Sequence, residues 1–243
     1  MSTTTPSTHL RRTVLITGAG GALGTHVSHA FEAAGWRLAL AAHTSQQRER
    51  LQGEHAGAAV GVVDLGDEDA ARTAIAELVG NAGGVDGLVN LVGGFAMSDA
   101  RSSTLDQLRH MLAVNLEAPY NAIRATLPHL TPGRNGFIIG IGAAPGLDGA
   151  AGMGPYAASK GALIAYLRSL RLELAREGIR VSLVHPLGAF DTPGNRAAMP
   201  DVDPALWIDP ADMAASILHL AERSGRGAID ELRVLTPPPP LST

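Results

Sequence analysis

Short apolar runs alternate along the chain with longer amphipathic segments. Seven of these runs predict strands, at residues 13–17, 37–42, 58–65, 85–94, 136–142, 179–186 and 229–235. They are rich in Val, Ile and Leu and lack the strict alternation of a half-exposed strand. Strands of this kind are buried on both faces, as in a parallel sheet that helices cover on both sides.

The segments between these runs predict helices at about 22–35, 67–79, 104–130 and 155–177. The last of them begins with Pro155 in its first turn and ends before Gly178, which are favoured residues at those two places. Strands and helices that alternate in this way indicate the α/β class, here a doubly wound, seven-stranded parallel sheet.

No break in composition marks a second domain, so we expect one domain over residues 12–236. Residues 1–11 lack an apolar core and predict a disordered N-terminal tail, and residues 237–243 predict a Pro-rich C-terminal tail. The proline-containing stretch at about 187–209 is long for a loop, which favours a lid over a site.

The composition of the chain argues against several classes of partner and chemistry. The chain has 243 residues, a formal net charge of −4, no basic run and no cysteine. These features argue against nucleic acid or an anionic membrane as partner and exclude disulfides and thiol chemistry. The nine histidines lack metal-ligand spacing, so we expect no metal site. Without a signal peptide or an apolar run long enough to span a bilayer, the sequence predicts a cytoplasmic protein.

The first predicted strand runs directly into a glycine-rich turn. Gly18, Gly20, Gly21 and Gly24 lie between this strand and its helix, in TGAGGALG. Such a turn lets backbone approach a pyrophosphate, and the helix N-terminus offers free amides to it. The position after a first strand favours a dinucleotide site over a mere tight turn.

The end of the second strand bears on the choice between NAD and NADP. A carboxylate there would bind the ribose hydroxyls and repel a 2′-phosphate, but this chain has Ala42 and no acid before Glu49. Nearby side chains could donate hydrogen bonds to a phosphate, namely His43, Thr44, Ser45 and Arg48. We therefore expect NADP(H), with NAD possible if these are only solvated loop residues.

Tyr156 and Lys160 lie four residues apart on a predicted helix, so they share one face of it. Lys160 is the only lysine, whereas the other basic residues are all arginine. An ammonium beside a phenol should lower the pKa of the phenol, which could then exchange a proton with a carbonyl or imine during hydride transfer.

Taken together, these motifs resemble the short-chain dehydrogenase/reductase family over about residues 12–236. The resemblance implies a single Rossmann-type domain, a nicotinamide cofactor and a homodimer or homotetramer. It implies Tyr156, Lys160 and Asn115 as catalytic residues, Asn115 holding a water in the proton relay. The cofactor-binding candidates are Gly18, Gly20, Gly21, Leu23, Gly24, His43, Asp64, Leu65, Asn90, Gly93, Tyr156, Lys160, Pro186 and Thr192.

Three positions depart from the family pattern: Ala22 in the glycine turn, Leu187 after Pro186, and Ala143 at the position of the catalytic serine. No Ser or Thr lies between Thr131 and Tyr156 to replace that serine. Losing one preorganised donor costs about 10²–10³ in rate. The substrate is therefore an activated, polarised acceptor, or the catalyst is weakened.

A narrower resemblance, to the dihydropteridine reductases, favours the first option. It is carried by the alanine at 143, by LVGGF after the fourth strand and by DTPGNRAAMPDVDPALW. It implies quinonoid dihydropterin as substrate. The candidate substrate contacts are Ala143, Asn195 and Arg196, and the last two could instead only pack within the lid. Two alternatives stay open: a ketoreductase or alcohol dehydrogenase acting on a small carbonyl, and a non-catalytic cofactor-binding regulator.

Overall fold

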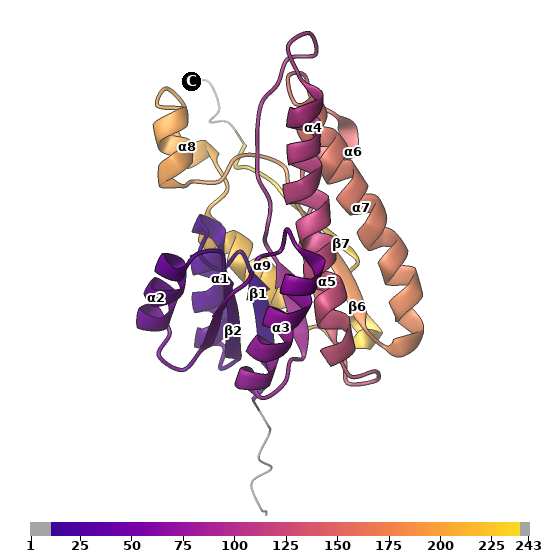
Figure 1. Ribbon diagram of the computed structural model, residues 1–243. Coiled ribbons are helices and arrows are strands. Elements are labelled where there is room, and N and C mark those ends of the chain that lie inside the picture. The colour runs from indigo at the N-terminus through magenta and orange to yellow at the C-terminus, as the bar shows by residue number, and fades with distance from the viewer. Residues whose placement is uncertain (1–10, 239–243) are drawn as a thin grey trace, which may run out of the picture.

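A single sheet of seven parallel strands organises the chain, as predicted, in the order β3-β2-β1-β4-β5-β6-β7 (Figure 1). The computed structural model describes residues 11–238, so most of both predicted tails lies outside the described residues. The strands are β1 Thr13–Thr17, β2 Arg37–Ala42, β3 Ala59–Val62, β4 Gly87–Asn90, β5 Phe137–Ile141, β6 Arg180–Pro186 and β7 Glu231–Val234.

Helices connect the strands and cover both faces of the sheet. They are α1 Ala22–Ala33, α2 Ser45–Glu54, α3 Glu68–Ala82, α4 Leu105–Leu112, α5 Ala118–Thr126, α6 Ala144–Asp148, α7 Gly154–Leu174, α8 Pro193–Ala198 and α9 Pro210–Glu222. A π-helical turn, Ala113–Glu117, joins α4 to α5, and short 3₁₀ turns lie at Leu127–His129, Ala175–Glu177, Pro204–Leu206 and Gly225–Gly227.

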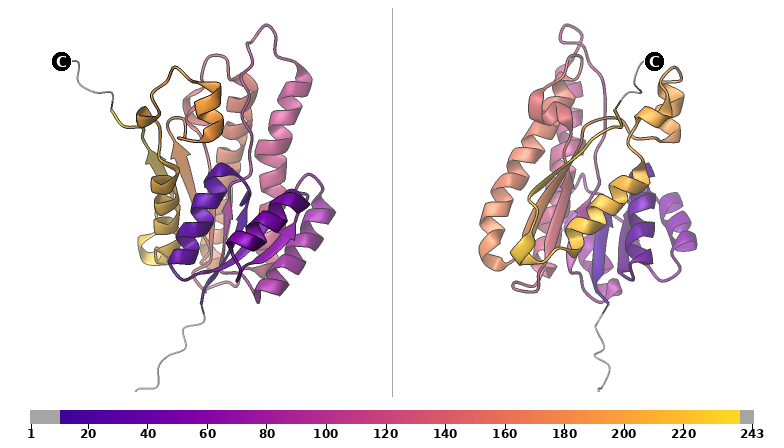
Figure 2. Two further views of the ribbon diagram at one scale, coloured as in Figure 1. Left: turned by 90° about the vertical axis from the view of Figure 1, so that its left-hand side faces the viewer. Right: turned by 180° about the vertical axis from the view of Figure 1, so that it is seen from behind.

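Two apolar layers hold the sheet. On one face, α1 and α9 lie side by side and bury Val27, Phe31 and Ile217 against it (Figure 2). On the other face α3, α5 and α7 contribute residues such as Ile75 and Leu167. Because both layers draw on the strands, every residue of β1, β4 and β6 is buried, which accounts for the mainly apolar sequences of these strands.

The structure corrects several element boundaries. The helix predicted at 104–130 is a succession of α4, the π-helical turn, α5 and a 3₁₀ turn, and β3 is only half as long as its apolar run. The stretch at 187–209 contains α8 and a 3₁₀ turn. Helices α2 and α9 were not identified from the sequence, although α9 carries the helical spacing of Met213, Ile217 and Leu220.

The strand order places a switch point between β1 and β4. From β1 the chain proceeds outward to β2 and β3, and then crosses back to β4 on the other side of β1. The Thr17 hydroxyl donates to the side-chain oxygen of Asn90 at 2.6 Å, which fixes the ends of these two strands together. Ligands of doubly wound sheets bind at this point, beyond the carboxyl ends of the strands.

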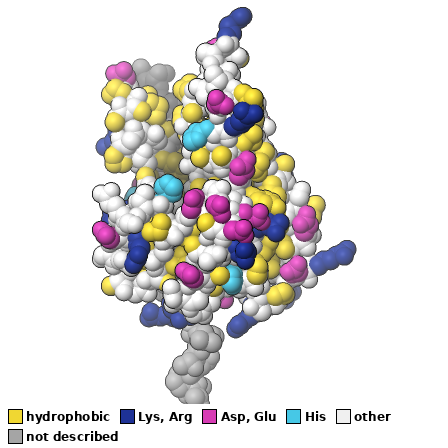
Figure 3. All heavy atoms as spheres, viewed as in Figure 1, with side chains coloured by type: hydrophobic (Ala, Val, Ile, Leu, Met, Phe, Trp, Pro, Cys, Tyr) yellow, Lys and Arg dark blue, Asp and Glu magenta, His cyan; other side chains and the backbone are white. Residues whose placement is uncertain are grey.

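The charges on the surface and the apolar character of the helices bear on which partners the protein can bind. On the face in Figure 3, basic side chains are scattered and acidic ones lie between them, in keeping with the net charge of −4. Within residues 11–238, no helix combines the length and the apolar character needed to cross a membrane. The cytoplasmic location and the oligomeric state stay predictions.

Candidate active site

The turn between β1 and α1 is shaped by its glycines. Gly18 has a φ of 70°, and a Cβ there would lie 3.0 Å from the carbonyl carbon of Leu91. A Cβ on Gly24 would overlap the carbonyl oxygen of Gly18. Gly21 is the N-cap of α1 and offers no side chain to the first-turn amides, which are left to bind an anion. The turn therefore fits the pyrophosphate of a nicotinamide cofactor.

Helix α2 packs its side chains over this turn. Gln47 lies so close to Gly20 that a Cβ on the glycine would be 2.6 Å from its amide carbon, and its side-chain oxygen accepts a hydrogen bond from the His43 amide at 3.0 Å. Arg50 donates to the carbonyl oxygen of Gly20 at 2.8 Å and to Glu54 at 3.0 Å. Arg50, which the sequence analysis did not single out, therefore reaches the glycine turn, while the role of Arg48 toward a phosphate stays a prediction.

Three further cofactor candidates lie just after β3 and in the first turn of α1. Asp64 is exposed, and its carboxylate accepts from the Gly66 amide at 2.9 Å, so at present it forms a local turn. Leu65 is buried, and its carbonyl oxygen accepts from Asn121 at 3.0 Å. Leu23, in the first turn of α1, packs against the apolar layer of that face.

Asn115 lies in the π-helical turn and is fully buried. Its side-chain oxygen accepts from the Gly94 amide at 2.9 Å, and its side-chain nitrogen donates to the Gly94 carbonyl at 3.0 Å and to the Ser159 hydroxyl at 3.1 Å. Ser159 in turn donates to the Tyr156 carbonyl at 2.7 Å. The Asn115 side chain therefore joins the glycine segment after β4 to α7. Its position in a π-helical turn is typical of functional sites, where such turns are frequent.

The predicted pair Tyr156 and Lys160 stands on the first turns of α7, on the side facing this cluster. Lys160 is 6% exposed, and its ammonium donates to the Ile141 carbonyl at 3.0 Å. A Cβ on Gly93 would lie 3.2 Å from that ammonium and 2.7 Å from the Asn115 side-chain oxygen. The structure thus brings Gly93, Asn115 and Lys160 together from three separate segments, and Tyr156 lies one turn before Lys160 on α7.

The pKa values in this site differ from the sequence prediction. Burial raises the pKa of the Tyr156 phenol to about 12, whereas the lysine was expected to lower it. Burial also lowers the pKa of Lys160 to about 8. The prediction was wrong because it counted the charge and neglected desolvation, which penalises the phenolate and the ammonium alike. At neutral pH Tyr156 is a protonated phenol, which suits a proton donor.

The position of the missing serine lies beside a buried histidine. Ala143 is 4% exposed and forms the N-cap of α6 without a side-chain hydrogen bond. A Cβ on the preceding Gly142 would overlap Nδ1 of His185, so only glycine fits there. Within the described residues, Nδ1 of His185 has no hydrogen-bond partner. No side-chain hydroxyl faces the substrate from this strand end.

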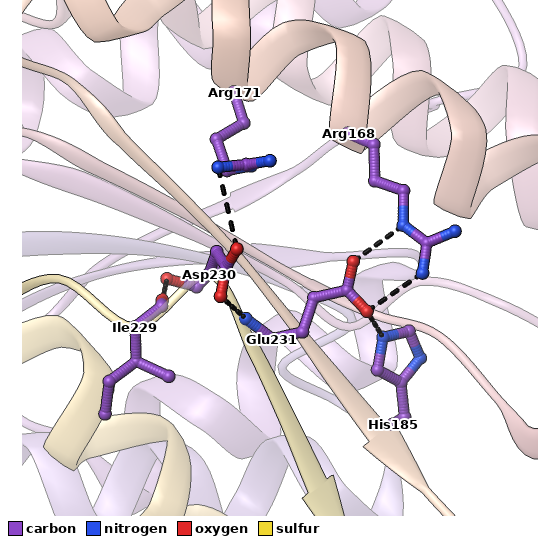
Figure 4. A network of polar contacts seen from close by, with 7 residues as sticks. Arg168, Arg171, His185, Ile229, Asp230 and Glu231 are labelled. Carbon is purple, nitrogen blue, oxygen red and sulfur yellow. Dashed lines mark hydrogen bonds and ion pairs between the residues drawn. The ribbon is translucent and has the colours of Figure 1, made fainter.

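An ion-pair network on the opposite side of His185 anchors α7 to the sheet (Figure 4). Arg168 of α7 contacts both oxygens of Glu231 in β7, at 2.6 and 3.0 Å. The same carboxylate accepts from Nε2 of His185 at 3.1 Å. Arg168 lowers the pKa of Glu231 through its hydrogen bond, and burial lowers the pKa of His185 and keeps it neutral. The network fixes the helix that carries Tyr156.

The segment after β6 contains the remaining predicted residues. Pro186 is buried at the end of β6. The Thr192 hydroxyl accepts from the Asn195 amide as the N-cap of α8, and the Asn195 side chain donates to the Phe190 carbonyl at 2.8 Å. Arg196 is paired with Asp191 at 2.6 Å. In this structure these polar groups hold the segment's own shape, and their contacts to cofactor or substrate stay predictions.

Comparison with known proteins agrees with this architecture. The pattern of the family described as short chain dehydrogenase matches residues 12–203. The chain belongs to the short-chain dehydrogenase/reductase family. It is therefore an oxidoreductase, an NAD(P)-dependent dehydrogenase/reductase.

Individual relatives are distant. The chain is 30% identical to a "Dehydrogenase/reductase SDR family protein 7-like" of Anopheles gambiae, with 87% of this chain and 72% of the relative aligned. It is 28% identical to an acetoacetyl-CoA reductase of an Acinetobacter species, over 88% of this chain and 92% of the relative. An L-fucose dehydrogenase of Bos taurus is 26% identical, over 88% and 84%. These three names give no support to the narrower resemblance to dihydropteridine reductases.

Proposed function

We propose that this protein is an NADP(H)-dependent reductase that transfers a hydride to a polarised acceptor, with quinonoid dihydropterin as the substrate. One observation carries the proposal. A half-buried, protonated Tyr156 lies one helical turn before the buried Lys160 on α7, while the serine position of the family holds the methyl group of Ala143. Such a site can give a proton but offers little stabilisation to an oxyanion, which favours an acceptor that already disperses negative charge.

Three side chains would take part in the reaction. The bound nicotinamide supplies the hydride. Tyr156 gives its phenolic proton to the acceptor atom that gains electron density, and is reprotonated from solvent. The ammonium of Lys160 stabilises the phenolate that Tyr156 then becomes. The Asn115 amide positions the Gly93–Gly94 backbone against α7, and the relay water implied by the family would lie at its π-helical turn.

Preference for NADP(H) over NAD(H) is supported by the charges around the end of β2. Ala42 leaves this strand end without a carboxylate, and His43 beside it is exposed. The Arg50 guanidinium lies on the glycine turn and is 39% exposed, with Glu54 as its partner. An arginine close to this turn can accommodate a 2′-phosphate, which would compete with Glu54 for it.

A second candidate is a ketoreductase or alcohol dehydrogenase acting on a small carbonyl. The similarity to an acetoacetyl-CoA reductase over most of both chains favours it. In that case a backbone amide or a bound water must replace the absent serine donor.

Initial rates on two acceptors separate these candidates. The full chain is assayed for oxidation of NADPH and of NADH with quinonoid dihydropterin and with ethyl acetoacetate. The proposal expects the higher kcat/KM with NADPH and quinonoid dihydropterin. Turnover of the ketoester alone would favour the second candidate and reject the first, and a preference for NADH would reject the cofactor assignment.

The role of Tyr156 is tested by Tyr156→Phe, which removes the phenolic hydroxyl group and keeps the aromatic ring. Turnover should fall by about 10² or more, the usual contribution of a positioned acid. The Kd for NADPH, followed by its fluorescence, should change little. Retained turnover would contradict the assignment of Tyr156, whereas loss of NADPH binding would show that the change had disturbed the fold.

A further inference from the structure

The connection between β4 and α4, residues 91–104, carries two large apolar side chains in an exposed position. Phe95 is 59% exposed and Met97 is 64% exposed. Figure 1 shows this connection running up beside α4 before the chain turns into that helix. Single exposed apolar residues are common on protein surfaces, so exposure alone assigns nothing here. The surroundings of Phe95 are more specific.

The ring of Phe95 packs on the ring of Tyr156. The two centroids are 5.0 Å apart and the planes meet at 83°, an edge-to-face contact. Phe95 therefore touches the proposed proton donor on one side and keeps more than half of its surface open. An acceptor that reaches the phenol of Tyr156 must come close to this open surface.

The backbone on both sides of Phe95 is held in place. Before it, Gly94 exchanges two hydrogen bonds with the side chain of Asn115. After it, the Ser98 amide donates to the Gly152 carbonyl at 2.7 Å, just ahead of α7. Both anchors lead to the helix that carries Tyr156. The ring is thus positioned before any substrate binds, which reduces the entropy lost on binding.

The alanine at 143 makes such a contact important. Without a serine hydroxyl, no side chain from the end of β5 can orient the acceptor through its oxygen. We propose that Phe95 is the specificity-determining residue of this site: its open ring packs against a planar, conjugated acceptor and orients it toward Tyr156. The inference rests on the proposed reductase function and adds to it the shape and chemistry of the acceptor.

Aromatic packing gives this residue a measurable effect. Contacts between aromatic rings contribute roughly 0.5–1.5 kcal/mol beyond the area they bury, so their loss corresponds to about a two- to twelvefold change. A small aliphatic acceptor presents no ring and gains little from Phe95. Truncation should therefore raise KM for planar acceptors selectively.

The test compares Phe95→Ala and Phe95→Trp in the full chain. The planar probes are phenanthrenequinone and quinonoid dihydropterin, and the aliphatic probe is ethyl acetoacetate. Leu105→Ala is the matched control, because Leu105 is 58% exposed and lies in the first turn of α4. Phe95→Ala should raise KM for the planar probes about two- to twelvefold, leave the ratio kcat/KM for the ketoester unchanged, and be rescued by Phe95→Trp.

Three results overturn the inference. If Phe95→Ala lowers kcat on planar and aliphatic probes by the same factor, the ring merely supports Tyr156. If the variant matches Leu105→Ala on all probes, or if the wild type reduces no planar probe, Phe95 does not select the acceptor. Reduction of phenanthrenequinone without reduction of quinonoid dihydropterin would reject the pterin substrate only, since the effect of Phe95 is read from the quinone.

Discussion

Replacing Lys160 with methionine should stabilise the fold while it abolishes turnover. Lys160 is 6% exposed, and burial lowers its pKa from 10.5 to about 8. At about 1.4 kcal/mol per unit of pKa, keeping the ammonium buried at pH 7 costs about 3 kcal/mol. Methionine has a similar length and no charge. It loses the hydrogen bond to the Ile141 carbonyl, which costs about 1–2 kcal/mol, so the net gain is about 1–2 kcal/mol.

The gain must depend on pH in a defined direction. The pKa of Lys160 is lower in the folded chain than in the unfolded chain, so between pH 8 and 10.5 the unfolded chain binds more protons. The wild type therefore becomes more stable as pH rises through this window. Methionine does not titrate, and the advantage of the variant should shrink by about 2 kcal/mol between about pH 7 and pH 9.5.

Urea unfolding of both proteins without cofactor, at these two pH values, measures the effect. Arg176→Met is the control, because Arg176 is exposed just beyond the end of α7 and its charge is already in water. A difference between Lys160→Met and wild type that stays constant with pH would refute the reasoning. So would a variant that is less stable than the wild type at pH 7.

Three further predictions concern other residues. Ala143→Ser should raise kcat/KM on simple ketones tenfold or more, because one preorganised oxyanion donor contributes up to about 10²–10³ in rate; no change on any ketone would show that the geometry at this strand end excludes them. Arg50→Gln should raise KM for NADPH about tenfold and leave KM for NADH unchanged; equal effects on both cofactors would limit Arg50 to a structural role at Gly20. Arg180→Met should lower Tm by about 5 °C in thermal unfolding, because Arg180 donates to the Leu220 and Ala221 carbonyls at the end of α9. An unchanged Tm would mean that water replaces these bonds.

The structure also shows where local reasoning was insufficient. The sequence did not predict helix α2, because its sequence SQQRERLQGE lacks the apolar spacing of an amphipathic helix. In the structure this helix buries only Leu51. Its Arg50 reaches the carbonyl of Gly20, thirty residues earlier in the chain, and no local pattern indicates that contact. The contact of Phe95 with Tyr156 likewise joins segments sixty-one residues apart.

The sequence by itself determined the local elements: the buried strands, the glycine turn and the helical face that carries the catalytic candidates. Unbroken apolar runs required strands buried on both faces, the glycines after the first strand required a turn that side chains would block, and four-residue spacing put Tyr156 and Lys160 on one helical face. Each of these follows from neighbours along the chain.

Only the tertiary structure decided how the parts act on one another. The Asn115 amide meets Gly94 and Ser159 because three elements converge at the ends of the strands. The burial of Tyr156 and Lys160 has the same origin, and it reversed the pKa direction that the charges alone suggested. Desolvation depends on everything packed around a group, and that packing exists only once distant segments have come together.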